Sequence, residues 1–291
     1  MKKAGYFFFS FLPLFASIAL QFASIIPMME FYLIRACFSN LLAGKKVGYS
    51  ELMMQLVSSS ESSTSILSLI FALSGILLFS FWYTRQFNGN LRELPEGIAK
   101  PGLILGLILL IPGLQMISAV LTSLSASFFP GWMDFYEKLM ESAGLTQDPS
   151  LMLILYAVVF GPIAEELTFR GVVLSSARKA MPFWAANLFQ AFLFGVFHLN
   201  LIQGIYAFMI GLFFGCVCSR GGSIYLSISL HILFNAWGTF MPTDSPLYTN
   251  PIYFLPFFLG SILFGIFGFY LFWKNTAKTA VNHSPDFSDI Y

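Results

Sequence analysis

The stretch LMLILYAVVFGPIAEELTFRG, residues 151–171, begins with an apolar run in which no side chain before Glu165 is charged. Glu165, Glu166 and Arg170 then follow within two helical turns. The run is long enough to cross a bilayer as a helix over residues 151–169. A charged side chain at membrane depth costs about 2.5–3.5 kcal/mol on insertion, so such residues usually face the bundle interior and have a function. We therefore look for the chemistry of this chain near Glu165.

The composition of the whole chain agrees with a membrane protein. Of 291 residues, 57% are hydrophobic and 10% are charged, against about 25% charged in an ordinary soluble domain. So apolar a chain has too little polar surface to cover a soluble core, and lipid is its expected partner. The net charge of +1 gives no reason to expect nucleic acid as a partner. The three cysteines are too few for a disulfide framework. The oligomeric state is left open.

We predict an all-α, polytopic membrane protein of about eight transmembrane helices with a buried catalytic cavity. A helix needs about twenty mostly apolar residues to span a bilayer. Segment 132–143 alternates apolar and charged residues at helical spacing, so we expect it to lie flat on the membrane surface. The predicted spans are 6–27, 65–83, 102–128, 151–169, 182–199, 203–219, 223–240 and 252–273.

Three parts of the chain differ in character. Residues 1–150, which hold the first three spans and the surface helix, have few polar side chains at membrane depth. Residues 151–240 hold nearly all of them and are the expected catalytic core. Residues 241–291 hold the last span and a polar tail.

Basic residues in the short loops predict the orientation of the chain, because such residues stay on the cytoplasmic side. With both termini in the cytoplasm, most basic residues face the cytoplasm and the acidic loop 130–150 lies outside. The localisation expected is the cell membrane. The basic residues predicted on the cytoplasmic side are Lys2, Lys3, Arg85, Arg92, Lys100, Arg178, Lys179, Arg220, Lys274 and Lys278, and those predicted outside are Arg35, Lys45, Lys46 and Lys138.

Helix geometry separates the two carboxylates. Glu166 and Arg170 are four residues apart, so they share a face and can form an ion pair. Glu165 is rotated by about 100° from Glu166 and lacks that partner. One carboxylate is therefore neutralised and positioned, whereas the other is left for another task.

Two further spans carry polar residues at matching places. His198 ends the fifth span, with Phe194 one turn before it, where the ring can pack against the imidazole. His231 and Asn235 share a face of the seventh span by the four-residue rule. Each motif alone fits a structural role, such as a buried ion-pair network, a satisfied buried histidine or interhelical hydrogen bonding. Their conjunction on three helices favours a functional site.

These motifs resemble those of the CPBP (CAAX protease and bacteriocin-processing, or Abi) family of intramembrane proteases, the relatives of the type II CAAX prenyl endopeptidase. The residues that match, over roughly 151–240, are Glu165-Glu166-x-x-Phe169-Arg170-Gly171, Phe194-x-x-x-His198 and His231-x-x-x-Asn235. Residues 1–150 show nothing that we match to this family. The resemblance implies an eight-helix membrane fold with a site that opens towards the cytoplasm.

The resemblance also implies roles for single residues. Glu165 activates the attacking water with His198 beside it, and Glu166 and Arg170 support Glu165. His231 and Asn235 hold the oxyanion of the tetrahedral intermediate, where a donor in a dry site is typically worth about 2.7–4 kcal/mol.

The motifs are compatible with two mechanisms, one with a zinc ion and one without a metal. The family was long described as metalloproteases, and Glu165, His198 and His231 could supply two histidines and a carboxylate to zinc. No His-Glu-x-x-His motif is present. Since Asn235 stands where a third acid would be expected, we favour a glutamate mechanism without metal or cofactor.

The function expected is that of an intramembrane endopeptidase acting on a membrane-associated or lipid-modified protein or peptide. The alternative is a non-catalytic membrane scaffold or bacteriocin-immunity protein with the same fold. A proton-relaying transporter is less favoured, because the ionisable residues cluster at one site.

One feature conflicts with straight spans. A helix that starts at residue 182 would carry His198 too near the outer face to meet Glu165. We therefore expect residues 182–189 to lie at the interface, because Asn187 and Gln190 are polar.

Overall fold

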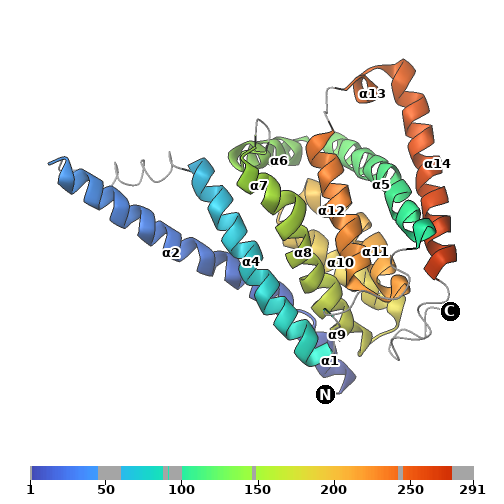
Figure 1. Cartoon of the computed structure of the whole chain (residues 1–291), viewed down its shortest axis with the longest axis horizontal. Helices are drawn as coiled ribbons and strands as arrows, with labels where there is room; N and C mark the ends of the chain where they lie inside the picture. The colour runs from blue at the N-terminus through green and yellow to red at the C-terminus, as the bar shows by residue number, and fades with distance from the viewer. Residues whose placement is uncertain are drawn as a thin grey trace.

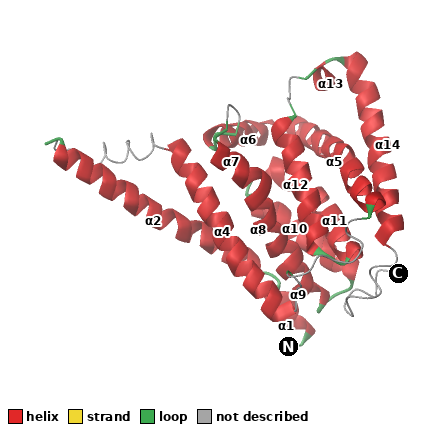
Figure 2. Cartoon of the chain, in the orientation of Figure 1, coloured by secondary structure: helices red, strands yellow, loops and turns green. Residues whose placement is uncertain are grey.

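The computed structural model describes residues 2–44, 60–87, 91, 100–145, 149–241 and 245–276. Within these ranges the regular structure is helical throughout, which confirms the all-α, polytopic fold class (Figure 2). In chain order the elements are α1 (Lys3–Phe9), α2 (Leu12–Leu42), α4 (Ser60–Phe87), α5 (Pro101–Phe128), α6 (Pro130–Ser142), α7 (Leu151–Leu155), the π-helix η1 (Tyr156–Phe160), α8 (Gly161–Glu166), the π-helix η2 (Leu167–Leu174), α9 (Ser175–Arg178), α10 (Phe183–Phe197), α11 (Leu201–Gly221), α12 (Ile224–Phe240), α13 (Pro246–Thr249) and α14 (Pro251–Thr276).

Six helices of the described residues are long and apolar enough to cross a membrane: Lys3–Ser24, Ser65–Phe87, Pro101–Phe128, Leu151–Arg178, Leu201–Gly221 and Pro251–Thr276. The other two predicted spans are also helices, but α10 has 15 residues and α12 has 17. At about 1.5 Å per residue, α10 is only about 22 Å long. The structure thus supports six spans of full length and two short apolar helices within the bundle.

Glycines allow the closest helix contacts. A Cβ atom at Gly113 of α5 would lie 2.8 Å from the Cα of Gly265 in α14, so the two backbones touch there. Similarly, a Cβ at Gly195 of α10 would lie 2.6 Å from the carbonyl oxygen of Gly204 in α11. Small residues at such crossings are typical of membrane helix bundles.

The helix α2 is longer than predicted. The first predicted span ends at residue 27, but α2 continues to Leu42, and its end extends away from the other helices (Figure 1). Lys45 and Lys46 lie outside the described residues. The surface helix predicted over residues 132–143 does form, as α6, whose residues all keep some exposure.

The fourth span is one continuous helix that contains two π-helical segments. The segment Leu151–Arg178 passes from α7 through η1, α8 and η2 to α9. In η1 the amide of Gly161 donates to the carbonyl of Tyr156, five residues back, instead of to Ala157. The next residue, Pro162, has no amide hydrogen to offer. The carbonyl of Ala157 is thereby left without a partner in its own helix, just before the two glutamates.

Candidate functional site

Glu166 and Arg170 form the predicted ion pair. Nη1 of Arg170 donates to Oε1 of Glu166 at 2.8 Å, and both side chains are fully buried. The guanidinium also donates through Nη2 to the carbonyl of Gly211 at 3.2 Å. Its carbon lies 4.5 Å from the ring centre of Phe194 and 5.2 Å from that of Phe214. These contacts hold the positive charge where water does not reach it.

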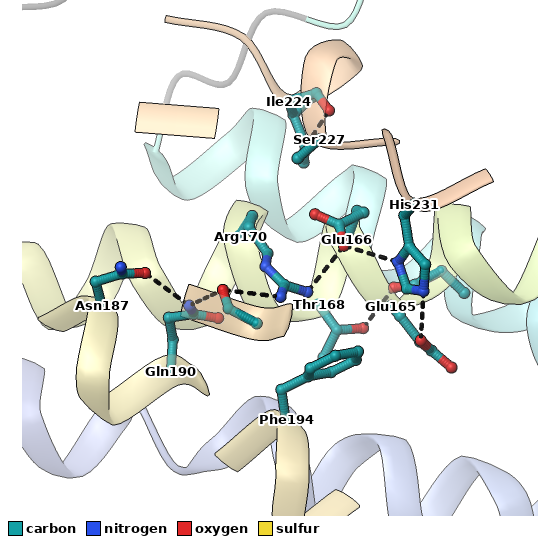
Figure 3. A network of polar contacts seen from close by, with 12 residues as sticks. Glu165, Glu166, Thr168, Arg170, Asn187, Gln190, Phe194, Ile224, Ser227 and His231 are labelled. Carbon is teal, nitrogen blue, oxygen red and sulfur yellow. Dashed lines mark hydrogen bonds and ion pairs between the residues drawn. The ribbon is translucent and has the colours of Figure 1, made fainter. Parts of the chain in front are cut away.

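His231 lies between the two glutamates (Figure 3). Its Nδ1 is 2.9 Å from Oε1 of Glu166, and its Nε2 is 3.6 Å from Oε2 of Glu165. Because the Glu166 carboxylate pairs with Arg170 and can only accept, Nδ1 of His231 carries the proton of that hydrogen bond. The ring nitrogen left over faces Glu165.

Glu165 differs from Glu166 in its surroundings. The side chain of Glu165 is 19% exposed, whereas that of Glu166 is fully buried and has Arg170 and His231 as partners. The carboxylate of Glu165 is thus the accessible one of the pair. This agrees with the separation that helix spacing predicted.

His198 ends α10 with a defined tautomer. Its Nδ1 is 2.8 Å from the carbonyl oxygen of Phe194. A carbonyl oxygen only accepts hydrogen bonds, so Nδ1 carries the proton and Nε2 of a neutral ring has a free lone pair. The Phe194 ring packs edge-on against the imidazole at 4.9 Å between ring centres, as predicted.

The turn after His198 fixes where the imidazole lies. Leu199 adopts a left-handed φ of 55°, which reverses the chain directly after the histidine. The side chain of Asn200 then donates to the carbonyl of His198 at 3.2 Å and accepts from the amide of Gln203 at 2.7 Å. It therefore caps α11 and holds the end of α10 at the same time.

The structure contradicts the reason for expecting residues 182–189 at the interface. The helix α10 starts at Phe183, and both Asn187 and Gln190 are fully buried. Their amides donate to the carbonyls of Leu212 at 3.1 Å and Gly211 at 3.0 Å, respectively. These polar residues fasten α10 to α11 and do not meet water. His198 reaches the site because the whole helix is short.

Asn235 donates a hydrogen bond to a backbone carbonyl of the fourth span. Its Nδ2 donates to the carbonyl of Ala157 at 2.8 Å. In an α-helix this oxygen would accept from the amide of Gly161, which here donates to the carbonyl of Tyr156. In a π-helix it would accept from residue 162, which is a proline and has no amide hydrogen. The carboxamide has two N–H donors, so one remains for another partner.

Several residues that contact the site could not be identified from the sequence. Gly211, which accepts from both Arg170 and Gln190, and Phe214, whose ring lies 4.7 Å from that of His231, are ordinary apolar-helix residues in the sequence. Asn200, Gln203 and Gln190 are polar, but nothing in their spacing separates a positioning role from interhelical hydrogen bonding. Only the packing of α11 against α10 and η2 reveals them.

The zinc alternative would need three ligands that converge on one point. Among the described residues, no three histidine, cysteine, aspartate or glutamate side chains lie close enough together to hold a metal ion. Nδ1 of His198 and Nδ1 of His231 are both engaged with oxygens of the protein, so Nε2 is the nitrogen of each ring that remains for another partner.

Known proteins resemble the same part of the chain. Residues 147–237 match the family described as "Type II CAAX prenyl endopeptidase Rce1-like". A Bacillus subtilis (strain 168) protein named "Putative membrane peptidase YdiL" is 28% identical over 94 residues. That match covers 32% of this chain and 38% of the relative. No solved structure matches the chain. The family resemblance predicted from the motifs is confirmed for this segment, and all the candidate site residues lie within it.

Proposed function

We propose that this chain is an intramembrane endopeptidase, because residues 147–237 match the type II CAAX prenyl endopeptidase Rce1-like family. Its substrate is a membrane-associated or lipid-modified protein or peptide. The proposed catalytic residues are Glu165, His198, His231 and Asn235, with Glu166 and Arg170 in support.

The attacking water is held between Glu165 and His198. In this proposal the water donates to two acceptors, the accessible carboxylate of Glu165 and the unprotonated Nε2 that the His198–Phe194 bond leaves free. A water that donates both hydrogens to these groups turns its lone pairs towards the scissile carbonyl. Glu165 accepts the proton as the carbon–oxygen bond forms, and general-base catalysis of this kind contributes about 10²–10⁴-fold.

His231 and Asn235 are the proposed oxyanion donors. Protonated at both nitrogens, His231 would be held by Glu166 on one side and would present Nε2–H on the side of Glu165. Asn235 keeps one N–H after its bond to Ala157. Both donors come from one face of α12, so a single rigid helix positions them.

One observation supports this proposal above the others, namely the unequal state of the two adjacent carboxylates. A structural ion-pair network would neutralise both. Here Glu166 has Arg170 and His231 at hydrogen-bond distance and no exposure, whereas Glu165 is partly exposed and lies 3.6 Å from Nε2 of His231. An accessible acceptor next to a buried, fixed charge pair is what water activation requires.

The test is cleavage of a quenched-fluorescence peptide library, with and without lipid-modified members, by protein purified in detergent. We expect cleavage by the wild-type protein and at least a 10³-fold loss in Glu165→Gln, which keeps the size of the side chain. Thr168→Ser, which removes a buried methyl group and keeps the hydroxyl that is bonded within its own helix, is the control and should remain active. Equal activity of wild-type and Glu165→Gln protein would favour the scaffold alternative.

A further inference from the structure

One oxygen of the buried Glu166 carboxylate has two hydrogen-bond donors, and the other oxygen has none. Oε1 accepts from Nη1 of Arg170 at 2.8 Å and from Nδ1 of His231 at 2.9 Å. Oε2 is buried and has no hydrogen-bond partner among the described residues. Buried polar atoms are nearly always hydrogen-bonded, and leaving a buried charged group without its donors costs more than leaving a neutral one. Oε2 therefore needs a donor other than those that bind Oε1.

The way α12 packs along the fourth span indicates where such a donor comes from. His231 of α12 binds Glu166. Two turns earlier on α12, the side chain of Ile224 lies 3.4 Å from the place that a Cβ atom of Gly171 would take. The two helices therefore run antiparallel here, and the face of α12 between these contacts lies against the fourth span between Gly171 and Glu166. Ser227 is in this interval, four residues before His231 and hence on the same face of α12.

Ser227 is fully buried, and its hydroxyl lies within hydrogen-bonding reach of the Glu166 carboxylate (Figure 3). In the structure the hydroxyl donates to the carbonyl of Ile224 at 3.0 Å, within its own helix. A hydroxyl has a single hydrogen to donate, so it binds one of these two acceptors at a time. A hydrogen bond to a carboxylate is about twice as strong as one between neutral groups. Donation to Glu166 in place of Ile224 exchanges a neutral hydrogen bond for a charge-assisted one.

We propose that Ser227 is a positioning residue of the site: its hydroxyl donates to Oε2 of Glu166 and so holds the carboxylate in the orientation that binds His231 through Oε1. This inference rests on the proposed function, in which His231 supplies Nε2–H to the oxyanion. The polar face of α12 then comprises Ser227, His231 and Asn235 at intervals of four residues, and each of the three donates to the fourth span.

Infrared spectroscopy of the purified protein tests this hydrogen bond without any assay of activity. Compared with the wild-type protein, Ser227→Ala should show a shift of carboxylate stretching bands, because Glu166 loses a donor. The shift should remain when both proteins also carry Glu165→Gln, which leaves Glu166 as the carboxylate of the site. Ser229→Ala, which changes an exposed serine of the same helix, is the matched control and should give no shift. Equal bands in the wild-type protein and Ser227→Ala, or a shift that is lost in the Glu165→Gln background, would overturn the inference.

Kinetics of peptide cleavage test the positioning role. Since Ser227 acts through Glu166 on an oxyanion donor, its loss should weaken binding of the transition state more than binding of the substrate. Per mole of folded protein, Ser227→Ala should lower kcat by about fivefold or more and change KM by less than about twofold. Ser227→Thr, which keeps the hydroxyl, should recover most of the lost kcat, and Ser229→Ala should keep wild-type values. A lower melting temperature of Ser227→Ala with an unchanged kcat would mean that Ser227 has a structural role alone, and would overturn the inference.

The two measurements separate this inference from the proposed function. A band shift in Ser227→Ala, together with a wild-type protein that cleaves no peptide, would refute the peptidase proposal and still establish the hydrogen bond between Ser227 and Glu166. Peptide cleavage with the same kcat in the wild-type protein and Ser227→Ala would do the opposite, because it supports the peptidase proposal and overturns the role of Ser227.

Discussion

At the scale of single residues, the site depends on how two adjacent carboxylates divide their partners. Glu166 is bound by Arg170 at 2.8 Å and by His231 at 2.9 Å. Glu165, one residue earlier, faces the other nitrogen of the same imidazole at 3.6 Å. His231 thus connects the structural carboxylate to the accessible one, and substitutions at the two positions should have different consequences.

Glu166→Gln is expected to lower stability strongly, because Arg170 would remain as an unpaired buried charge. The loss of one partner of a buried pair typically costs about 3–5 kcal/mol. Glu165→Gln should leave thermal stability almost unchanged, since this side chain is partly exposed and has no short hydrogen bond. Thermal unfolding of both variants in the same detergent measures the difference. Equal losses would mean that the roles of the two carboxylates are assigned wrongly.

The proposed mechanism also predicts independence from metal. Activity should survive extensive dialysis against EDTA and phenanthroline, and the purified protein should contain far less than one equivalent of zinc. Zinc would need nitrogens of His198 and His231 at about 2.0–2.1 Å from one point, and among the described residues no group of three such side chains lies close enough together to hold a metal ion. Stoichiometric zinc, with activity lost on chelation and restored by zinc, would contradict the glutamate mechanism.

At the scale of elements, the π-helix η1 connects a backbone irregularity to a candidate catalytic side chain. Single-turn π segments in α-helices are frequent at functional sites. Here the shifted winding and Pro162 together release the carbonyl of Ala157, and Asn235 binds it at 2.8 Å. Asn235 therefore has a positioning role that is independent of any contact with substrate.

A double variant separates the two roles of Asn235. Asn235→Leu should destabilise the protein, because the half-buried carbonyl of Ala157 would lose its donor, and an unsatisfied carbonyl costs about 1–3 kcal/mol when it is fully buried. Pro162→Ala supplies an amide hydrogen five residues after Ala157, so the stability loss of Asn235→Leu should be smaller in the Pro162→Ala background. Activity should stay low in the double variant, since the oxyanion donor is still absent. The same stability loss in both backgrounds would show that the Ala157 bond matters little.

The contact between α5 and α14 should tolerate no side chain at its centre. A Cβ at Gly113 would lie 2.8 Å from the Cα of Gly265 and 3.2 Å from the carbonyl oxygen of Ser261, and neither backbone atom can move alone. Gly113→Ala should therefore lower the melting temperature, as overpacking typically costs about 1–3 kcal/mol. Gly260→Ala, also on α14 but with nothing within 4 Å of the added carbon, is the control and should be neutral or stabilising.

At the scale of the whole molecule, charge divides the bundle into two ends. Five basic residues lie where helices begin or end on the side of α1 and α9: Arg85, Lys100, Arg178, Lys179 and Lys274. The acidic helix α6 lies on the other side (Figure 1). If basic loops stay in the cytoplasm, both termini are cytoplasmic and α6 is outside.

Orientation can be measured apart from the site. In a variant without native cysteines, Met140→Cys on α6 should react with an impermeant maleimide added to intact cells. Lys274→Cys, at the end of α14, is the cytoplasmic control and should react only after lysis. Reaction of Met140→Cys only after lysis would reverse the proposed orientation.

The sequence by itself determined the membrane environment, the helical class and the identity of the polar cluster. These follow from local facts: the length of apolar runs, the cost of charge in lipid, and spacings of four residues that bring Glu166 to Arg170 and Phe194 to His198. Such contacts within one helix depend only on helical geometry.

The tertiary structure decided what lies between helices. Three features depend on how the helices pack: α10 ends at the site, Asn187 and Gln190 fasten it to α11, and Asn235 binds the carbonyl of Ala157. A polar residue in an apolar helix must find a partner, but its own sequence does not say which neighbouring helix supplies it. The partner is fixed only when the backbones pack.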